Sequence, residues 1–253
     1  MDLGLADRVY VVTGASRGLG FATAECLAAD GARVVICSRG SDHVDAAAQR
    51  LGGAGHAVGI AADLADPATA GRLVEVAHQS FGRFDGALIS VGAPLRGTAA
   101  QITDDQWRSA FETVFLGAVR AARTFAAALE PGGAIGFVLS STARSAEHGL
   151  GISNGLRPGL AGVAKDMADE YASRGVRIIS LLPHRIRTER LKEVFAATGD
   201  AAQAELDTAA AIPMGRLGEA AEFGRVAAFL LSPAAGYLTG ISVPVDGGAL
   251  RSA

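Results

Sequence analysis

Hydrophobic residues along this chain gather in short runs, separated by longer segments with helical spacing. The short runs are continuously apolar rather than alternating, which is typical of strands buried on both faces of a sheet. They predict strands at 8–12, 33–37, 57–61, 86–90, 134–139, 177–182 and 241–245. The intervening segments predict helices near 18–29, 43–51, 67–82, 104–129, 155–173 and 219–231.

Capping residues support several of these boundaries. Asp30-Gly31 is expected to end the first helix, Asp66-Pro67 to open the third, and Thr103-Asp104-Asp105 to cap the long fourth helix. Strands that alternate with helices in this way predict an α/β fold, in which a doubly wound parallel sheet of seven strands carries helices on both faces.

No linker, repeat or low-complexity block interrupts the alternation, so residues 1–253 are expected to form a single domain. The segment 196–211 is rich in Ala and Gly and predicts a mobile helical insertion. We expect the region around 186–208 to act as a lid over a substrate.

Composition narrows the functional classes. The chain of 253 residues is 49% hydrophobic and carries a formal charge of -3, which gives no reason to expect nucleic acid or an anionic membrane as a partner. No apolar run approaches a membrane span and no secretory signal is visible, so a cytoplasmic protein is expected. Cys26 and Cys37 are interpreted as core thiols, and the five histidines lack metal-ligand spacing, so no metal is expected.

A glycine-rich turn, Thr13-Gly14-Ala15-Ser16-Arg17-Gly18-Leu19-Gly20, joins the first predicted strand to the first predicted helix. Such a turn directs backbone N–H groups and the positive helix end at an anion, usually a diphosphate. The residues expected to contact a dinucleotide here are Gly14, Ser16, Arg17, Gly18, Leu19 and Gly20.

The end of the second strand indicates which dinucleotide is preferred. Ser38 stands where an acidic residue would bind the adenosine ribose, and Arg39 follows it. With Arg17, two guanidinium groups would favour a 2′-phosphate, so NADP(H) is expected over NAD(H); the alternative is that both arginines are solvated surface residues. Asp63 and Leu64 follow the third strand, where Asp63 could accept a hydrogen bond from adenine or cap the next helix.

Together these features resemble the short-chain dehydrogenase/reductase family, over nearly the whole chain. Thr13–Gly20 matches its T-G-x-x-x-G-x-G motif, Pro213 to Gly218 its P-x-x-R-x-G segment, and Val245-Asp246-Gly247-Gly248 its closing signature. The resemblance implies a Rossmann fold and hydride transfer between NAD(P)(H) and a carbonyl or alcohol. It also implies cofactor contacts at Ser90, Gly92, Pro183, Ile186 and Thr188.

The chain departs from the family at its catalytic tetrad of Asn, Ser, Tyr and Lys. The tyrosines are Tyr10, Tyr171 and Tyr237, and neither Lys165 nor Lys192 follows one of them by four residues. Alignment outward from Lys165 places Ser153 at the tyrosine position and Arg157 at the lysine position. A one-residue gap would instead place Asn154 and Pro158 there.

The other two catalytic positions are affected unequally. Ser140, or its neighbour Ser141, matches the family serine, whereas Val114 replaces the asparagine. The segment Ile89-Ser90-Val91-Gly92 replaces the family's N-N-A-G, and His184 replaces the glycine after Pro183.

These replacements change the expected proton chemistry. Ser153 can donate a hydrogen bond but is a poor proton source, and Arg157 can hold ribose hydroxyls but cannot release a proton near neutrality. His184 and His148 are the candidates for proton transfer, with Glu147 or water admitted through the lid as further possibilities. Each of the three side chains could instead be an exposed or packing residue.

Two functions remain open. The first is an atypical NADP(H)-dependent oxidoreductase acting on a small, partly apolar carbonyl or alcohol, because Leu95, Leu150, Ile152 and Phe195 lie in segments expected to face the pocket. The second is a non-catalytic nucleotide-binding protein, either a redox sensor or an assembly subunit. The resemblance also implies a homo-oligomer, either a tetramer or a dimer.

Overall fold

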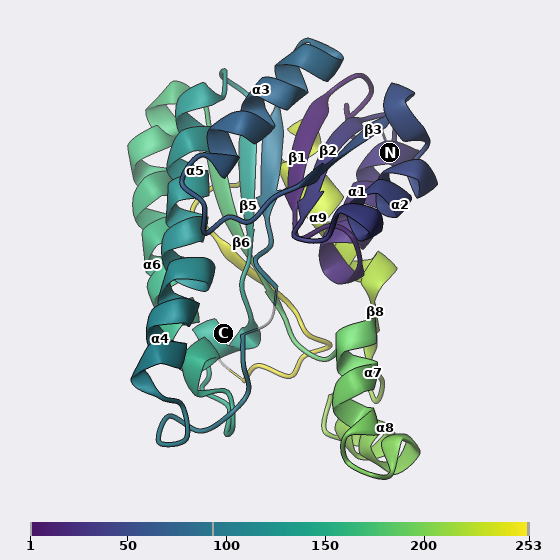
Figure 1. Cartoon of the computed structure of the whole chain (residues 1–253), viewed down its shortest axis with the longest axis vertical. Helices are drawn as coiled ribbons and strands as arrows, with labels where there is room; N and C mark the ends of the chain where they lie inside the picture. The colour runs from purple at the N-terminus through teal and green to yellow at the C-terminus, as the bar shows by residue number, and fades with distance from the viewer. Residues whose placement is uncertain (1, 93, 252–253) are drawn as a thin grey trace.

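A single parallel sheet forms the centre of the computed structural model, which describes residues 2–92 and 94–251. Seven strands lie in the order β3-β2-β1-β4-β5-β6-β9 (Figure 1). Their bounds are β1 Val9–Thr13, β2 Arg33–Ser38, β3 Ala57–Ala61, β4 Gly86–Ile89, β5 Ala134–Val138, β6 Arg177–Pro183 and β9 Ser242–Val245. The predicted doubly wound parallel sheet is confirmed, with strand boundaries that differ from the predicted ones by at most one residue.

Helices cover both faces of the sheet (Figure 1). One face packs against α1 Gly18–Ala29, α2 Ser41–Arg50 and α9 Ala220–Leu231, and the other against α3 Thr69–Phe81, α5 Gly117–Ala128 and α6 Gly151–Tyr171. The inner strands therefore bury both their faces, which explains the continuous apolar runs of β1 and of the middle of β2, whereas the edge strands β3 and β9 are only partly buried.

The strand order reverses between β1 and β4, and two hydrogen bonds join these strands at their carboxyl ends. The Thr13 hydroxyl donates to the Ser90 carbonyl at 3.0 Å and accepts from the Ser90 N–H at 2.8 Å. A Cβ on Gly14 would lie 2.4 Å from the Ser90 carbonyl oxygen, so only glycine fits. Beyond this point the two chain segments diverge, which opens a crevice of the kind that binds ligands in such sheets.

The predicted helix 104–129 is divided in the structure. It consists of α4 Asp104–Ala110, a π-helical turn Phe111–Leu116 and α5. The predicted cap is confirmed: the Thr103 hydroxyl accepts from the Gln106 N–H at 3.3 Å in a capping box. The hydrophobic pattern did not reveal the π turn, because one additional residue per turn hardly alters helical spacing over so short a stretch.

The next helix, α6, begins at Gly151, four residues before its predicted start. Its first turn has no side-chain cap. Instead the Gly97 N–H donates to the Gly149 carbonyl, and the Gly151 N–H donates to the Gly97 carbonyl, each at 2.8 Å. A contact with a distant loop therefore sets this helix start, and no local sequence signal marks it.

The predicted lid region forms two helices, α7 Glu189–Ala196 and α8 Ala201–Ala210, which project from the body of the molecule (Figure 1). A short parallel pair, β7 Ile186–Arg187 and β8 Gly218–Glu219, connects them to the body and was not predicted. Arg187 forms ion pairs with both Glu205 and Glu219. One guanidinium thus joins α8 to β8.

Candidate active site

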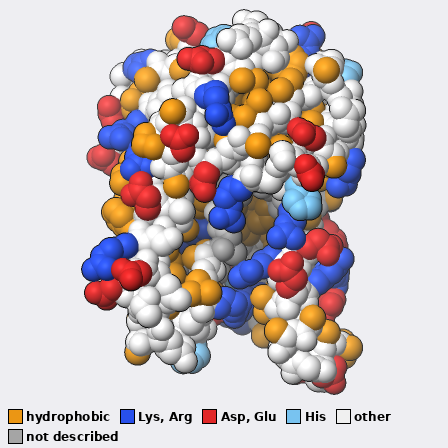
Figure 2. All heavy atoms as spheres, in the orientation of Figure 1, with side chains coloured by type: hydrophobic (Ala, Val, Ile, Leu, Met, Phe, Trp, Pro, Cys, Tyr) orange, Lys and Arg blue, Asp and Glu red, His pale blue; other side chains and the backbone are white. Residues whose placement is uncertain are grey.

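A cleft of about 1150 Å³ lies at the carboxyl ends of the strands, between the sheet and the α7–α8 projection. Figure 2 shows the hollow, with cationic side chains gathered around it. Six arginines line it, namely Arg17, Arg39, Arg96, Arg157, Arg185 and Arg190, against three acids, Asp63, Asp105 and Glu189. The whole chain has a net charge of -3, so positive charge is concentrated at the cleft.

Every residue expected to contact a dinucleotide lines this cleft. The set is Gly14, Ser16, Arg17, Gly18, Leu19, Gly20, Ser38, Arg39, Asp63, Leu64, Ser90, Gly92, Arg157, Pro183, Ile186 and Thr188. They come from six separate segments of the chain, and the fold brings them to one surface. The glycine turn, the end of β2 and the segment after β6 therefore meet as the sequence predicts.

The glycine turn leaves space for a ligand in front of α1. The first turn of α1 has no side-chain cap, so its N–H groups are open to the cleft. Among the described residues other than its chain neighbours, a Cβ on Gly18 would have a single neighbour within 4 Å, the Thr188 methyl at 3.9 Å, and a Cβ on Gly92 would have none. This open, positively polarised helix end fits a diphosphate.

Ser38, Arg39 and Arg17 stand around the same end of the cleft. The Ser38 hydroxyl donates to the Gly40 carbonyl at 3.4 Å, a long bond that a ligand can replace. Arg39 is exposed and has no ion pair among the described residues. The Arg17 guanidinium lies 3.5 Å from the Glu193 carboxylate, with both side chains more than half exposed. Both guanidinium groups remain accessible to an anion.

Asp63 also faces the cleft. Its carboxylate accepts a hydrogen bond from the Ala65 N–H at 3.0 Å, which forms a local turn. It does not cap α3, because that helix begins at Thr69 and the carboxylate that accepts from the Ala68 N–H belongs to Asp66. The capping alternative for Asp63 is therefore wrong, and its second carboxylate oxygen has no described partner.

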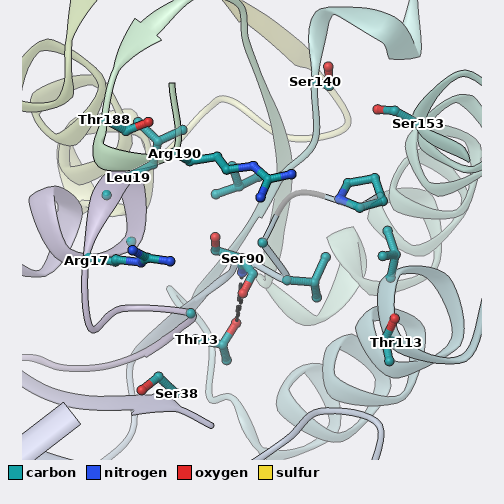
Figure 3. Close-up of a pocket in the computed structure, with 18 of the residues that line it drawn as sticks. Thr13, Arg17, Leu19, Ser38, Ser90, Thr113, Ser140, Ser153, Thr188 and Arg190 are labelled. Carbon is teal, nitrogen blue, oxygen red and sulfur yellow. Dashed lines mark hydrogen bonds between the residues drawn. The ribbon is translucent and has the colours of Figure 1, made fainter. Parts of the chain in front are cut away.

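Two serine hydroxyls line the far side of the cleft (Figure 3). Ser140 lies two residues after the end of β5, and its Oγ accepts from the Thr142 N–H at 3.2 Å. Ser153 lies in the first turn of α6, and its Oγ is 2.8 Å from Thr142 Oγ1. Thr142 thus contacts both serines. No sequence signal marks its contact with Ser153, because the two residues are eleven positions apart.

Arg157 is almost fully buried, with 4% of its surface exposed, and no carboxylate pairs with it among the described residues. One guanidinium nitrogen donates to the Val138 carbonyl and another to the Gly92 carbonyl, each at 3.0 Å. Its Nε has no hydrogen-bond partner in the part of the chain that the structure describes. Burial lowers the pKa of Arg157 to about 10, which still leaves the side chain charged at neutral pH.

His184 lines the cleft, and its Nδ1 lies 3.0 Å from Ser141 Oγ. Burial, with a smaller effect from Arg185, lowers the pKa of His184. His148, in contrast, is exposed and is not among the residues that line the cleft. Glu147 is also outside the lining, and its carboxylate pairs with Arg185. The structure therefore keeps His148 apart from the other candidates, whereas Glu147 lies close enough to His184 to act on its charge but is held by Arg185.

Arg190 was missed in the sequence. It extends from the first turn of α7 into the cleft (Figure 3), and its nearest described carboxylate, that of Glu193, is 4.0 Å away. Arg96 and His43 also line the cleft without a sequence motif to identify them. Arg190 follows Thr188 by two residues, so proximity to a motif residue was the one signal available.

The described ranges, 2–92 and 94–251, lack two further kinds of site. Within these ranges no group of His, Cys, Asp and Glu could hold a metal ion. No helix there is sufficiently long and apolar to cross a bilayer.

Residues 14–249 match the sequence profile of the family described as enoyl-(acyl carrier protein) reductase. Among curated proteins, the chain is 31% identical to the 3-oxoacyl-(acyl-carrier-protein) reductase of Escherichia coli, over 95% of this chain and 96% of the relative. It is 33% identical to an uncharacterised oxidoreductase of Mycobacterium tuberculosis, over 96% and 92%.

Solved structures give the same result. L-sorbose reductase of Gluconobacter frateurii, complexed with NADPH and L-sorbose, superposes with a TM-score of 0.93 at 28% identity over the full length of both chains. A short-chain oxidoreductase of Pseudomonas aeruginosa, described as containing an atypical catalytic centre, superposes with a TM-score of 0.90 at 30% identity, again over both full chains. The chain therefore belongs to the short-chain dehydrogenase/reductase family of NAD(P)-dependent oxidoreductases.

Proposed function

We propose that this protein is an NADP(H)-dependent oxidoreductase with a non-standard active site, acting on a small, partly apolar carbonyl or alcohol. The observation that carries the proposal is the meeting of Ser140, Ser153, Arg157 and His184 in the cleft that also contains the glycine turn. Leu95, Leu150 and Ile152 supply apolar surface there. When bound, the dinucleotide supplies or accepts the hydride.

The glycine turn and the start of α1 would hold the diphosphate, with Thr188 beside Gly18. Arg17, Ser38 and Arg39 would surround a 2′-phosphate, and this arrangement supports NADP(H) over NAD(H). Gly92, Pro183 and Ile186 would lie along the nicotinamide half. L-sorbose reductase, whose structure contains NADPH, has the same fold.

Arg157 would act electrostatically on the reacting oxygen. A buried guanidinium without a counter-ion creates a positive potential at the cleft floor, which favours negative charge on a nearby substrate oxygen. Ser140 and Ser153 would donate hydrogen bonds to that oxygen. Neither hydroxyl is acidic enough to supply the proton itself.

His184 is the residue we propose for proton transfer. It lines the cleft, whereas His148 is exposed outside it and Glu147 is neutralised by Arg185. The imidazolium form would donate a proton to the substrate oxygen during reduction, and the neutral form would accept one during oxidation.

The α7–α8 projection is proposed as a lid over the substrate. Leu191 and Val194 of α7 line the cleft, so movement of this helix would change access to it. A homo-oligomer, either a tetramer or a dimer, is proposed as well. Phe111 and Tyr237 are exposed and would gain burial in such an assembly.

The cofactor proposal is tested by calorimetry with NADPH and NADH. We expect NADPH to bind more tightly, and Arg39→Ala to weaken NADPH about tenfold while leaving NADH unchanged, because one charge-assisted contact is lost. Arg123→Ala, at an exposed arginine of α5, is the control and should change neither affinity. Equal affinity of the wild type for both dinucleotides would contradict the preference.

Activity is tested with NADPH or NADP and a panel of small ketones, aldehydes and secondary alcohols. We expect turnover that His184→Asn lowers by about 10²- to 10⁴-fold with unchanged NADPH affinity, as for loss of an acid–base group. Tight NADPH binding without turnover on any panel member would support the alternative, a non-catalytic NADP-binding protein.

A further inference from the structure

Ser141 contacts His184 but does not itself line the cleft. It is the first residue of the 3-10 turn Ser141–Ala143 that follows β5, and only 6% of its surface is exposed. Its Oγ is 3.0 Å from His184 Nδ1, which is its sole hydrogen-bond partner among the described residues. Because buried polar groups are normally hydrogen-bonded, the Ser141 hydroxyl is expected to bond to His184.

The main chain that carries the ring is anchored as well. The His184 N–H donates to the Val245 carbonyl at 3.2 Å, which ties the end of β6 to β9. Because Nδ1 faces Ser141, Nε2 is the ring nitrogen left for a ligand in the cleft. The residue thus presents a defined nitrogen to the site.

A hydroxyl group can serve both protonation states of histidine. It accepts a hydrogen bond from the Nδ1–H of an imidazolium and donates one to the bare Nδ1 of a neutral ring. A buried Nδ1–H without an acceptor would be costly, and hydrogen bonds to charged groups are stronger than those to neutral groups. Ser141 therefore stabilises the protonated ring more than the neutral one.

We propose that Ser141 is the positioning residue that allows His184 to gain and release a proton at Nε2. The inference rests on the proposed function. In reduction, the Nε2–H bond breaks and an O–H bond forms on the substrate as hydride reaches the carbon. His184 is left neutral with Nδ1–H donating to Ser141, and solvent restores its proton. Oxidation runs the same steps in reverse.

Charged groups around His184 also affect how readily its ring is protonated. Arg185 disfavours the imidazolium, whereas Glu147 and Asp246 favour it, and burial has the largest effect, lowering the pKa. Arg185 and Glu147 pair with each other, so their influences on the ring largely cancel. Ser141 is the neutral group in direct contact with Nδ1, and it compensates part of the burial cost.

The test measures the pKa of His184 in the protein without added ligand, by NMR titration of the histidine Cε1–H signals. The His184→Asn spectrum assigns the signal among the five histidines. We expect Ser141→Ala to lower that pKa by about one pH unit, through loss of an acceptor for a buried N–H. Ser141→Thr keeps the hydroxyl and should restore the wild-type value.

Ser145→Ala is the matched control, because Ser145 is exposed in the same loop. It should leave the His184 pKa unchanged. Thermal unfolding of each variant verifies folding, and Ser141→Cys, whose thiol is a weak hydrogen-bond acceptor, carries the comparison if Ser141→Ala unfolds and should lower the His184 pKa in the same direction. An unchanged His184 pKa in a folded Ser141→Ala protein, or an altered one in Ser141→Thr, would overturn the inference.

A second measurement follows turnover against pH in the reductive direction. The pH at which the rate begins to fall should decrease by the same one unit or so in Ser141→Ala, and rates above it should drop about tenfold. Absence of turnover in the wild type with the NMR shift intact would refute the proposed function while leaving the Ser141–His184 coupling in place. If the wild type turns over but Ser141→Ala shifts neither the His184 pKa nor the pH profile, the Ser141–His184 coupling is refuted and the proposed function stands.

Discussion

At Arg157, the free-energy cost of burying a charge opposes the stabilisation from two hydrogen bonds to backbone carbonyls. A pKa near 10 instead of 12.5 means that burial disfavours its charged form by about 3 kcal/mol. Against this, it satisfies the carbonyls of Val138 and Gly92, which would each cost about 1–3 kcal/mol if left unpaired. The two effects are of similar size, so stability gives little reason for an arginine here. The electrostatic role that we propose for Arg157 toward a ligand in the cleft would give such a reason.

Arg157→Met should accordingly change the free energy of unfolding by less than about 2 kcal/mol, because relief of the buried charge offsets the lost carbonyl bonds. Turnover should fall at least about tenfold, since the positive potential at the cleft floor is removed. Urea denaturation and steady-state kinetics provide the two measurements. A loss of 4 kcal/mol or more with activity retained would make Arg157 a structural clamp instead.

At the scale of elements, the crossing of α1 and α9 depends on a glycine. A Cβ on Gly224 would lie 2.4 Å from the Ala22 carbonyl oxygen and 2.9 Å from the Cys26 sulfur. The helices therefore touch backbone to backbone, which brings Phe223 and Ala227 into the core. Because α1 begins at the glycine turn, this contact also helps to position the open helix end at the cleft.

Gly224→Ala should destabilise the protein by about 1–3 kcal/mol, the usual cost of overpacking a well-filled contact. Gly71→Ala is the matched control. Gly71 also lies in a helix, but a Cβ there meets none of the residues that the structure describes within 4 Å, so the change should stabilise α3 by about 0.5–1 kcal/mol. Chemical denaturation measures the free energy of unfolding of both variants. If the two substitutions change it in the same direction, the backbone contact at Gly224 is not the cause of the effect there.

At the scale of the whole molecule, titratable groups set a pH window for stability. Burial raises the pKa of Cys37 and of Tyr10 to about 12, from 9.0 and 10.0. Their neutral forms are favoured in the folded state, so they contribute stability below about pH 9 that is lost as pH rises toward 12. His184 has a lowered pKa and acts at the other end, because the unfolded chain binds its proton first as pH falls below 6.5.

We therefore expect the thermal midpoint of the ligand-free protein to be highest between about pH 6.5 and 9 and to fall on both sides. Cys37→Ala should reduce the fall above pH 9, and His184→Gln should reduce the fall just below pH 6.5. Differential scanning calorimetry across this range measures both. If Cys37→Ala matches the wild-type thermal midpoint above pH 9, or His184→Gln matches it below pH 6.5, the substituted residue is not a source of the pH dependence.

The sequence by itself determined the sheet, most helices and the dinucleotide cleft. Buried parallel strands must be continuously apolar, and a glycine turn between strand and helix needs φ values that other residues disfavour, as at Gly14 and Gly18 with φ of 59° and 65°. These are local requirements, and local requirements leave a mark in the order of residues. The segments that carry Ser38, Asp63 and Thr188 could be placed because each follows a recognisable strand or motif.

Only the tertiary structure decided the chemistry around His184. The sequence offered His184, His148 and Glu147 without a means of choosing, because each lies in a loop whose path no periodic pattern defines. Folding placed His184 against Ser141, forty-three residues away in the chain, left His148 exposed, and paired Glu147 with Arg185. Hydrogen bonds between residues so far apart depend on how strands and loops are brought together, and that information appears only once the chain has folded.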